Sequence, residues 1–331
     1  MLDAGTLLIL VIALALIFDF INGFHDTANA IATSVSTRVL SPKTAIVMAS
    51  IMNLVGAMSG TAVAKTVGAG LVDPASVTQL TILSALIAAT LWDLLTWYYG
   101  LPTSSSHAML SSLIGAAIAS AGTGVIIGAG VVKILMGLVF SPIVGFGLGY
   151  LAMTAIAVAF RNTTPSAVNN TFKRLQIMSA AYIAFSHGNN DAQKTMGIIT
   201  MALVSYGALT SFVVPLWVIF ACALAISFGT AAGGWRIIKT LGVKLAPLRP
   251  VNGFAVDSVA ATVIEIASRI GLPLSTTHVI SSTIMGVGSS QRLSAVRWAV
   301  GGNIILAWVI TIPICMILSW AICSVLHLML G

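Results

Sequence analysis

Long apolar runs follow one another along almost the whole chain, and they constrain its fold more than any other feature. Only 7% of the 331 residues are charged, whereas soluble domains carry about 25% charged residues. A soluble monomer with this sequence would expose far more apolar surface than water tolerates. The sequence therefore predicts an all-α polytopic membrane protein with about ten spans. The runs cover 6–24, 44–64, 76–99, 124–140, 141–160, 175–205 with interruptions, 209–232, 253–270 and 295–328, the last with room for two short spans.

Basic residues gather between these runs, without aromatic residues among them and without a nucleic-acid motif. Basic loops beside the membrane therefore explain the net charge of +7, and no nucleic-acid partner is expected. By the positive-inside rule the N-terminus lies outside and the first three basic stretches lie inside. If each later run counts as one span, Arg292 and Arg297 fall outside, against that rule. The stretches are Arg38/Lys43, Arg161/Lys173/Arg174, Arg236/Lys239/Lys244/Arg249 and Arg292/Arg297.

Two segments far apart in the chain repeat each other. Residues 100–115 read GLPTSSSHAMLSSLIG and residues 271–286 read GLPLSTTHVISSTIMG, with proline, hydroxyl residues and histidine in register. The apolar stretches over 103–120 and 274–288 are too short for full spans, which is typical of re-entrant helices. AATLWD before the first motif also matches AATVIE before the second.

A second, weaker repeat consists of GFHDTANA over 23–30 and GNNDAQKT over 188–195. The basic loops give the two halves opposite orientations, so we expect an inverted-topology repeat with two re-entrant helical hairpins. The predicted division has a first repeat over 1–160 with a hairpin near 100–120, a short basic cytoplasmic linker over 161–174, and a second repeat over 175–331 with a hairpin near 271–290.

Six of the eight acidic residues lie in or beside apolar runs, where a charge is costly without a partner. Asp26 and Asp191 have amide and hydroxyl neighbours, including Asn29 and Asn190, and such oxygens suit Na⁺, Mg²⁺ or a proton. Glycines in both motifs allow a helix to break there. The alternative for both carboxylates is a helix end that faces water. The other four are Asp19, Asp93, Asp257 and Glu265, of which Asp93 and Glu265 correspond in the repeat and serve either a coupling ion or buried hydrogen bonds.

The two GLP motifs have the residue types that bind an anion. Proline ends one helix and a hydroxyl caps the next, so free N–H groups and hydroxyls converge. Two ordinary helix caps are the alternative. His107 and His278 carry protons or, as we favour, support the half-helices by hydrogen bonds. Lys194 either neutralises Asp191 or contacts an anion. The expected oxyanion-binding set is Ser104, Ser105, Ser106, Ser275, Thr276, Thr277 and Gln193.

No catalytic constellation is present in the sequence. The Ser–His proximity occurs twice at a helix start and is no triad, and no phosphate-binding P-loop is found. The three cysteines lie in apolar runs and give no metal pattern. We therefore expect a secondary transporter that is not an enzyme, has no cofactor and holds no structural metal.

At these residues the sequence resembles the inorganic phosphate transporter (PiT) family over essentially the whole chain. DFINGFHDTANAIAT over 19–33 is similar to the family signature G-x-N-D-x-A-N-A-x-x-T, with His25 in place of the usual asparagine. FSHGNNDAQK over 185–194 resembles the second copy. The GLP motifs resemble the family's P-x-S-S/T-S/T-H hairpins.

The resemblance implies symport of inorganic phosphate with H⁺ or Na⁺, as the free ion or as a neutral metal–phosphate complex, by alternating access. Phosphate would lie between the hydroxyls of 104–106 and 275–277. The coupling-ion set would be Asp26, Asn29, Asn190, Asp191, Asp93 and Glu265, with His107, His278, His25 and Lys194 in supporting roles.

The expected location is the plasma (inner) membrane as a multi-pass protein, with phosphate and membrane lipid as partners. A homo-oligomer is compatible with the sequence, which carries no signal of the oligomeric state. The alternatives are a symporter of sulfate or another oxyanion and, less favoured, an ion channel.

Overall fold

The computed structural model describes residues 3–330, and these are helical apart from turns and one isolated β-bridge between Val72 and Ile126. The helices are α1 Ala4–Ser36, α2 Pro42–Ala57, α3 Ala62–Gly70, α4 Gln79–Tyr99, α5 Ser105–Ala121, α6 Gly128–Ala159, α7 Pro165–Tyr206, α8 Leu216–Ala232, α9 Trp235–Lys239, α10 Pro250–Arg269, α11 Thr276–Gln291 and α12 Trp298–Leu330. Short helical turns lie at η1 Pro74–Ser76, η2 Thr123–Val125, η3 Thr240–Leu245 and η4 Leu293–Ala295.

Several helices begin at a residue whose side chain caps the first turn. Ser104 and Ser275 are the N-caps of α5 and α11, and each hydroxyl accepts the backbone N–H three residues later at 3.2 Å, as the GLP motifs predict. At the N-cap of α1, hydrogen bonds from the Thr6 side chain and backbone lower the pKa of the Asp3 carboxyl below its usual value.

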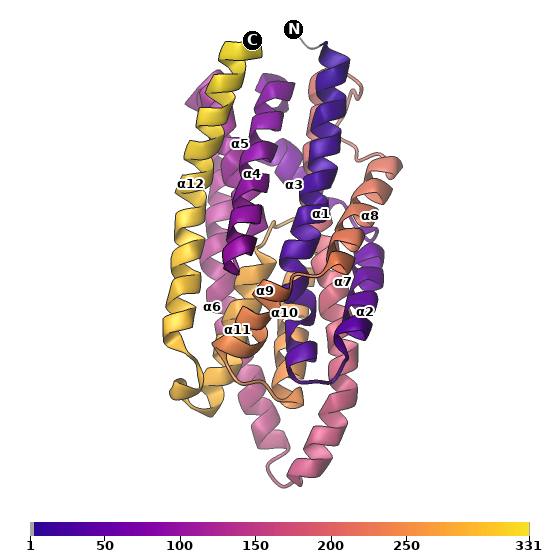
Figure 1. The fold of residues 1–331 in the computed structure, drawn as a ribbon, viewed down its shortest axis with the longest axis vertical. Helices are drawn as coiled ribbons and strands as arrows, with labels where there is room; N and C mark the ends of the chain where they lie inside the picture. Colours follow the sequence, from indigo (N-terminus) through magenta and orange to yellow (C-terminus); the bar gives the residue numbers. More distant parts are fainter. Residues whose placement is uncertain (1–2, 331) are drawn as a thin grey trace.

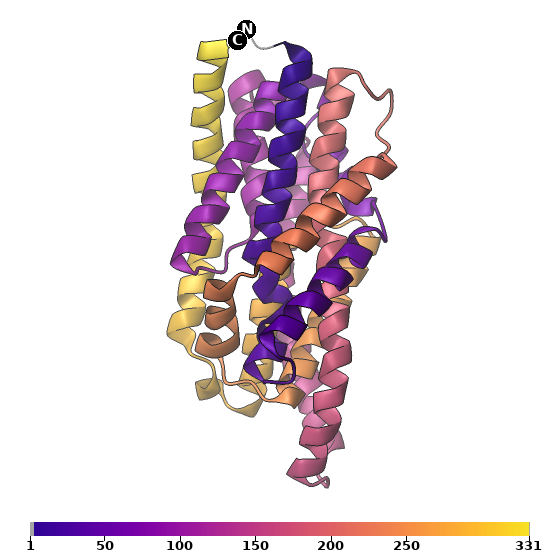
Figure 2. The ribbon, with the colours of Figure 1, turned by 45° about the vertical axis from the view of Figure 1, so that its right-hand side comes forward.

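The long helices α1, α6, α7 and α12 extend along the molecule, and both chain ends lie at the same end of it (Figure 1). Two shorter pairs enter from opposite ends. α4 runs from the end with the termini to about mid-height and α5 returns, whereas α10 rises from the other end and α11 returns (Figures 1 and 2). The tips of the two pairs meet: the Ser106 hydroxyl donates to the Leu274 carbonyl at 3.3 Å.

Five helices in the described part of the chain are long and apolar enough to cross a membrane, namely α1, α4, α6, α10 and α12. Two bent pairs, α2 with α3 and α8 with α9–η3, raise the number to seven. This is fewer than the ten predicted spans, partly because 124–140 and 141–160 form the single helix α6 and 295–328 forms the single helix α12. Pro142 and Pro313 lie inside these two helices. Membrane helices tolerate proline, so neither residue ends its helix. The exact number of crossings stays a prediction.

The expectation that the glycines of the acidic motifs break a helix is wrong, because α1 and α7 continue through them. They bring helices together instead, because a Cβ on Gly23 would lie 2.3 Å from the Ile226 carbonyl oxygen of α8. A Cβ on Gly188 would lie 2.2 Å from the Asn53 carbonyl oxygen of α2. Close backbone contact through small residues is a common way to pack membrane helices.

The segment 292–297 lies on the same side as the other basic stretches, not on the opposite side. The Arg297 backbone N–H donates to the Leu245 carbonyl at 3.0 Å, and its guanidinium donates to the Lys244 carbonyl at 3.4 Å. The expectation fails because α10 and α11 form a hairpin that returns to the side from which it came (Figure 1). The predicted linker 161–174 contains the start of α7 at Pro165.

Candidate functional site

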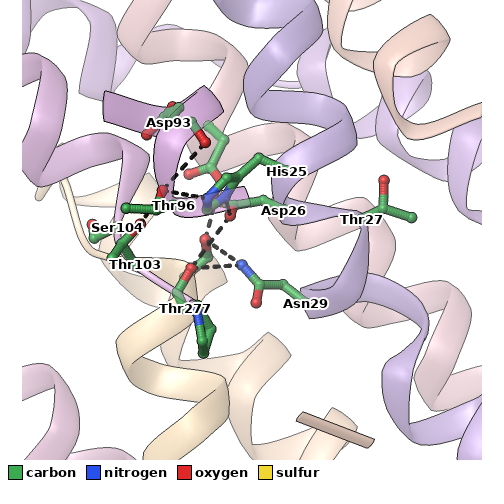
Figure 3. Close-up of polar contacts among 12 residues, drawn as sticks. His25, Asp26, Thr27, Asn29, Asp93, Thr96, Thr103, Ser104 and Thr277 are labelled. Atoms are coloured by element: carbon green, nitrogen blue, oxygen red, sulfur yellow. Dashed lines mark hydrogen bonds and ion pairs between the residues drawn. The ribbon is translucent and has the colours of Figure 1, made fainter. Parts of the chain in front are cut away.

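The middle of α1 presents a buried carboxylate to the tip of the first hairpin (Figure 3). His25 Nδ1 lies 2.7 Å from Asp26 Oδ1, and His25 Nε2 lies 3.1 Å from the Thr96 hydroxyl at the end of α4. Thr103 donates to the same Thr96 oxygen at 2.9 Å. His25 thereby connects Asp26 to the turn that precedes the first hydroxyl motif, as a supporting residue would.

The second hairpin reaches the same part of α1 with its two threonines. The Asn29 amide donates to Thr277 Oγ1 at 2.9 Å and to Thr276 Oγ1 at 3.3 Å. Thr277 Oγ1 in turn lies 3.5 Å from Asp26 Oδ1 (Figure 3). Residues of the predicted ion set and of the predicted anion set are therefore in direct contact.

The carboxylate of α7 lies on the other side of this hairpin tip. Asp191 Oδ2 accepts from the Thr276 hydroxyl at 3.0 Å and lies 3.1 Å from His187 Nε2. Lys194 forms an ion pair with Asp191 Oδ1 and also donates to the Ser106 hydroxyl and to the Leu274 carbonyl. Lys194 thus neutralises Asp191 and contacts both hairpins, so the two roles considered for it are not exclusive.

Three of these side chains form a group that could hold a cation. Asp26, His187 and Asp191 each offer one ligand atom, and these atoms lie within 4.8 Å of one another. His187 is missing from the predicted ion set. It precedes Asp191 by four residues on α7, and that spacing places both side chains on one helix face, a signal that could have identified it.

Buried carboxylates outnumber buried cations around this centre. Lys194 is the one buried lysine or arginine among residues 3–330, whereas Asp19, Asp26, Asp93 and Asp191 are all buried. Both carboxylate oxygens of Asp93 and one of Asp19 have no hydrogen-bond donor among the described residues. The side-chain oxygens of Asn22, Asn29 and Asn190 also lack one. Such an excess of acceptors fits cations or protons as ligands.

The hydroxyls of the two hairpin starts are all buried. Ser104 and Ser275 serve as caps, so their oxygens already accept backbone N–H groups. Ser106, Thr276 and Thr277 reach Lys194, Asp191 and Asn29 as described. Ser105 Oγ has no partner in the described part of the chain. The N-terminal ends of α5 and α11 and these hydroxyls together can donate to an oxyanion without a fixed countercharge.

Three predicted residues lie apart from this cluster. Gln193 is engaged by the start of α3, since its Oε1 accepts from the Val63 N–H at 2.8 Å. Glu265 accepts from the Asn189 amide at 3.0 Å and pairs with Arg269. The Asn190 amide donates to the Ser268 hydroxyl of α10 at 2.8 Å. Gln193 and Glu265 line a neighbouring cavity of about 360 Å³.

Asp257 is also buried, but it belongs to a different contact. It accepts hydrogen bonds from the Thr33 hydroxyl at 2.7 Å and from the Ser179 hydroxyl at 3.4 Å. These bonds join α10 to α1 and α7. Both of its oxygens thus have donors, unlike those of Asp93, and its arrangement is that of a structural group.

The motif histidines stack at the point where the hairpins meet. The rings of His107 and His278 lie 4.8 Å apart between centroids, and the Trp308 ring lies 3.9 Å from His278. The Trp308 indole donates to the Pro102 carbonyl at 3.0 Å. His107 also contacts the Ser104 hydroxyl at 2.7 Å. Trp308 on α12 therefore contacts both tips, and no motif in the sequence marks it.

Comparison with known proteins relates this chain to transport proteins. A sequence profile described as the phosphate transporter family matches residues 22–319. A probable low-affinity inorganic phosphate transporter of Bacillus subtilis is 51% identical over 311 residues, 93% of each chain. A protein of the same description from Rhizobium meliloti is 46% identical over 322 residues, covering 97% of this chain and 96% of the relative.

A solved structure has the same fold. It is described as the sodium-dependent phosphate transporter, is 27% identical, and superposes with a TM-score of 0.88 over 98% of this chain and 100% of the other. These relatives are named as transport proteins rather than enzymes.

Proposed function

This chain belongs to the phosphate transporter family, and on that premise we propose that it imports inorganic phosphate across the plasma membrane as a secondary symporter. Its bacterial relatives are named low-affinity phosphate transporters. The name of the solved relative includes sodium dependence, which supports a cation as the driving ion. The fold and the central site determine how such coupling would work.

The contact between hydroxyls and carboxylates at the hairpin tips carries this proposal. Thr276 belongs to the start of α11, where an oxyanion would bind, and it donates to Asp191. Asn29 of α1 donates to Thr276 and Thr277. An anion that accepts hydrogen bonds from these hydroxyls removes hydrogen-bond donors from Asp191 and Asp26. Anion and cation binding are therefore linked through shared side chains.

The cation would bind among the buried acceptors of α1, α4 and α7. Asp26, His187 and Asp191 supply an imidazole and two carboxylates, and this ligand set suits Na⁺ less than a proton or a divalent metal. A divalent ion would then enter as cargo in a neutral complex with phosphate. A second cation would find both carboxylate oxygens of Asp93 and Oδ2 of Asp19, which lack donors among the described residues.

Alternating access would follow from two structural repeats of opposite orientation. α1 and α7 carry the acidic motifs, and the α4–α5 and α10–α11 hairpins enter from opposite ends (Figure 1). α6 and α12 each contain a proline, Pro142 and Pro313. We propose that the halves rock against each other around the meeting hairpin tips, so that the site faces one side at a time.

Uptake of labelled phosphate by proteoliposomes tests the proposal. We expect accumulation above equilibrium when an inward Na⁺ gradient, an inward pH gradient or external Mg²⁺ is imposed, and the effective gradient identifies the coupling ion. Arsenate should compete and sulfate should not. Accumulation of sulfate in place of phosphate would support the other-oxyanion symporter. Flux that only equilibrates phosphate under every gradient would refute coupling and favour a channel.

A further inference from the structure

A basic vestibule lies beside the tip of the second hairpin, between α3, α6 and α10. Lys65, Lys133 and Arg269 line this cavity of about 530 Å³, together with small and apolar residues. Arg269 pairs with Glu265, yet 76% of its side chain is exposed. Neither lysine forms an ion pair within residues 3–330. The vestibule therefore presents an excess of positive charge to its own interior.

The vestibule leads toward the central site. Ala62 and Arg269 line both this cavity and the cavity of about 360 Å³ that contains Asn189 and Gln193. Ser268 also lines the smaller cavity, and its hydroxyl accepts from the amide of Asn190, the residue before Asp191 on α7. A ligand that moves from one cavity to the other therefore approaches α7 beside Asn190.

The position of these cations is unusual for a membrane protein. α6 begins at the end that carries both termini (Figure 2), and Lys133 lies in its first two turns. The four basic stretches lie at the opposite end, which the positive-inside rule assigns to the cytoplasm. The side chains of Lys65, Lys133 and Arg269 are all exposed, so their charges are available to an anion in the cavity.

At two of the three corresponding positions in the other half the sequence carries no charge. K-T-V-G at 65–68 recurs as K-T-L-G at 239–242, so Lys65 corresponds to Lys239 on the cytoplasmic side. Arg269, two residues before one GLP motif, corresponds to Tyr98 before the other. Lys133, nine residues before Pro142, corresponds to Ile304 before Pro313. Lys133 and Arg269 therefore have no charged counterpart in the other half.

We propose that the basic vestibule is an outer binding site for free inorganic phosphate, which captures the anion before it reaches the central site. This inference rests on the function proposed above. Three cations around a wet cavity hold a tetrahedral oxyanion weakly, since no rigid donor set encloses it. A cleft of one charge raises the local concentration of its ligand and the rate of association. The vestibule thereby lowers the external phosphate concentration needed for uptake.

Lys65→Gln and Lys133→Gln test the proposal, because neither lysine contacts the central cluster. We expect each to raise the KM for phosphate uptake about threefold or more, and the pair to raise it further, with the maximal rate unchanged. Added inert salt should raise the KM of the unaltered protein more than that of the double variant. Lys173→Gln, an exposed lysine at the cytoplasmic end of α7, is the matched control and should leave the KM unchanged.

Chemical restoration of charge separates an electrostatic role from a structural one. Lys65→Cys should have a raised KM that the cationic reagent trimethylammonioethyl methanethiosulfonate restores and the anionic reagent sulfonatoethyl methanethiosulfonate does not. The native Cys222, Cys315 and Cys323 are buried, so the unaltered protein serves as the control. Equal effects of both reagents would overturn the proposal.

Two further arms identify the ligand and the source of a failure. A lipid headgroup carries the same phosphate chemistry, so the comparison is repeated in pure phosphatidylcholine and with added phosphatidylglycerol. A KM difference present in both supports free phosphate, and one that needs phosphatidylglycerol refutes it. If the unaltered protein accumulates phosphate while Lys65→Gln and Lys133→Gln match it, the vestibule proposal alone fails. If the unaltered protein accumulates none, the proposed function fails first.

Discussion

Single buried carboxylates in this protein differ in how many donors they have. Asp257 accepts from two hydroxyls, and such a satisfied group stabilises the fold. Asp26 shares its Oδ1 with His25 and with a hydroxyl of the second hairpin. These contacts of Asp26 can change when a ligand binds. Transport roles are therefore expected at Asp26 and not at Asp257.

Asp26→Asn should abolish cation-driven accumulation of phosphate while the protein still inserts and folds. The amide is nearly the same size but cannot carry the charge that a coupling cation offsets. Labelled uptake in proteoliposomes under the effective gradient measures the loss. Asp257→Asn makes the same change at another buried carboxyl group and should keep accumulation. Wild-type accumulation by Asp26→Asn would show that this carboxylate is structural.

Thr276→Val should weaken phosphate binding, because it removes the hydroxyl that donates to Asp191 and accepts from Asn29. An unmet buried hydrogen bond costs about 1–3 kcal/mol, or roughly a fivefold to hundredfold rise in Kd. Titration calorimetry with phosphate in detergent measures the change. Thr276→Ser keeps the hydroxyl and should bind within about twofold of the unaltered protein. An unchanged Kd in the valine variant would place phosphate elsewhere.

At the scale of elements, local chemistry identified the hairpins better than the spans. The Pro-x-Ser-Ser/Thr pattern predicts the helix starts at Ser104 and Ser275, because capping depends on a few neighbouring residues. Whether adjacent apolar runs fuse is a matter of packing, so the single helix α6 could not be read from 124–140 and 141–160. The continuity of α7 through Gly188 likewise depends on α2, a contact that only the fold shows.

Gly188→Ala should destabilise the protein by forcing α2 and α7 apart. The new Cβ would meet backbone of Asn53, which cannot rotate away, and such overpacking costs about 1–3 kcal/mol. Thermal unfolding in detergent, followed by tryptophan fluorescence, should show a lower Tm. Gly147→Ala on α6 is the control, since among the described residues no atom outside its own turn of helix lies within 4 Å of its Cβ position. A Tm equal to that of Gly147→Ala would contradict the close α2–α7 contact.

At the scale of the whole molecule, the basic residues and the hairpins give one consistent orientation. Counting every apolar run as a span puts Arg292 and Arg297 on the wrong side, because periodicity and length do not distinguish a re-entrant pair from a crossing. Once α10 and α11 return to one side, all four basic stretches share an end (Figure 1). The basic vestibule is then the exception, because its cations lie in the outer half of the molecule.

Ser294→Cys decides between these two topologies. Ser294 is exposed in the turn η4, close to the basic segment that ends α9–η3. A membrane-impermeant maleimide should label it only from the cytoplasmic side, as it should Thr163→Cys between α6 and α7. Ser211→Cys, in the exposed connection between α7 and α8, should react only from outside. Labelling of Ser294→Cys from outside would mean that the α10–α11 segment crosses the membrane once instead of returning, and two hairpin tips could then not meet at a central site.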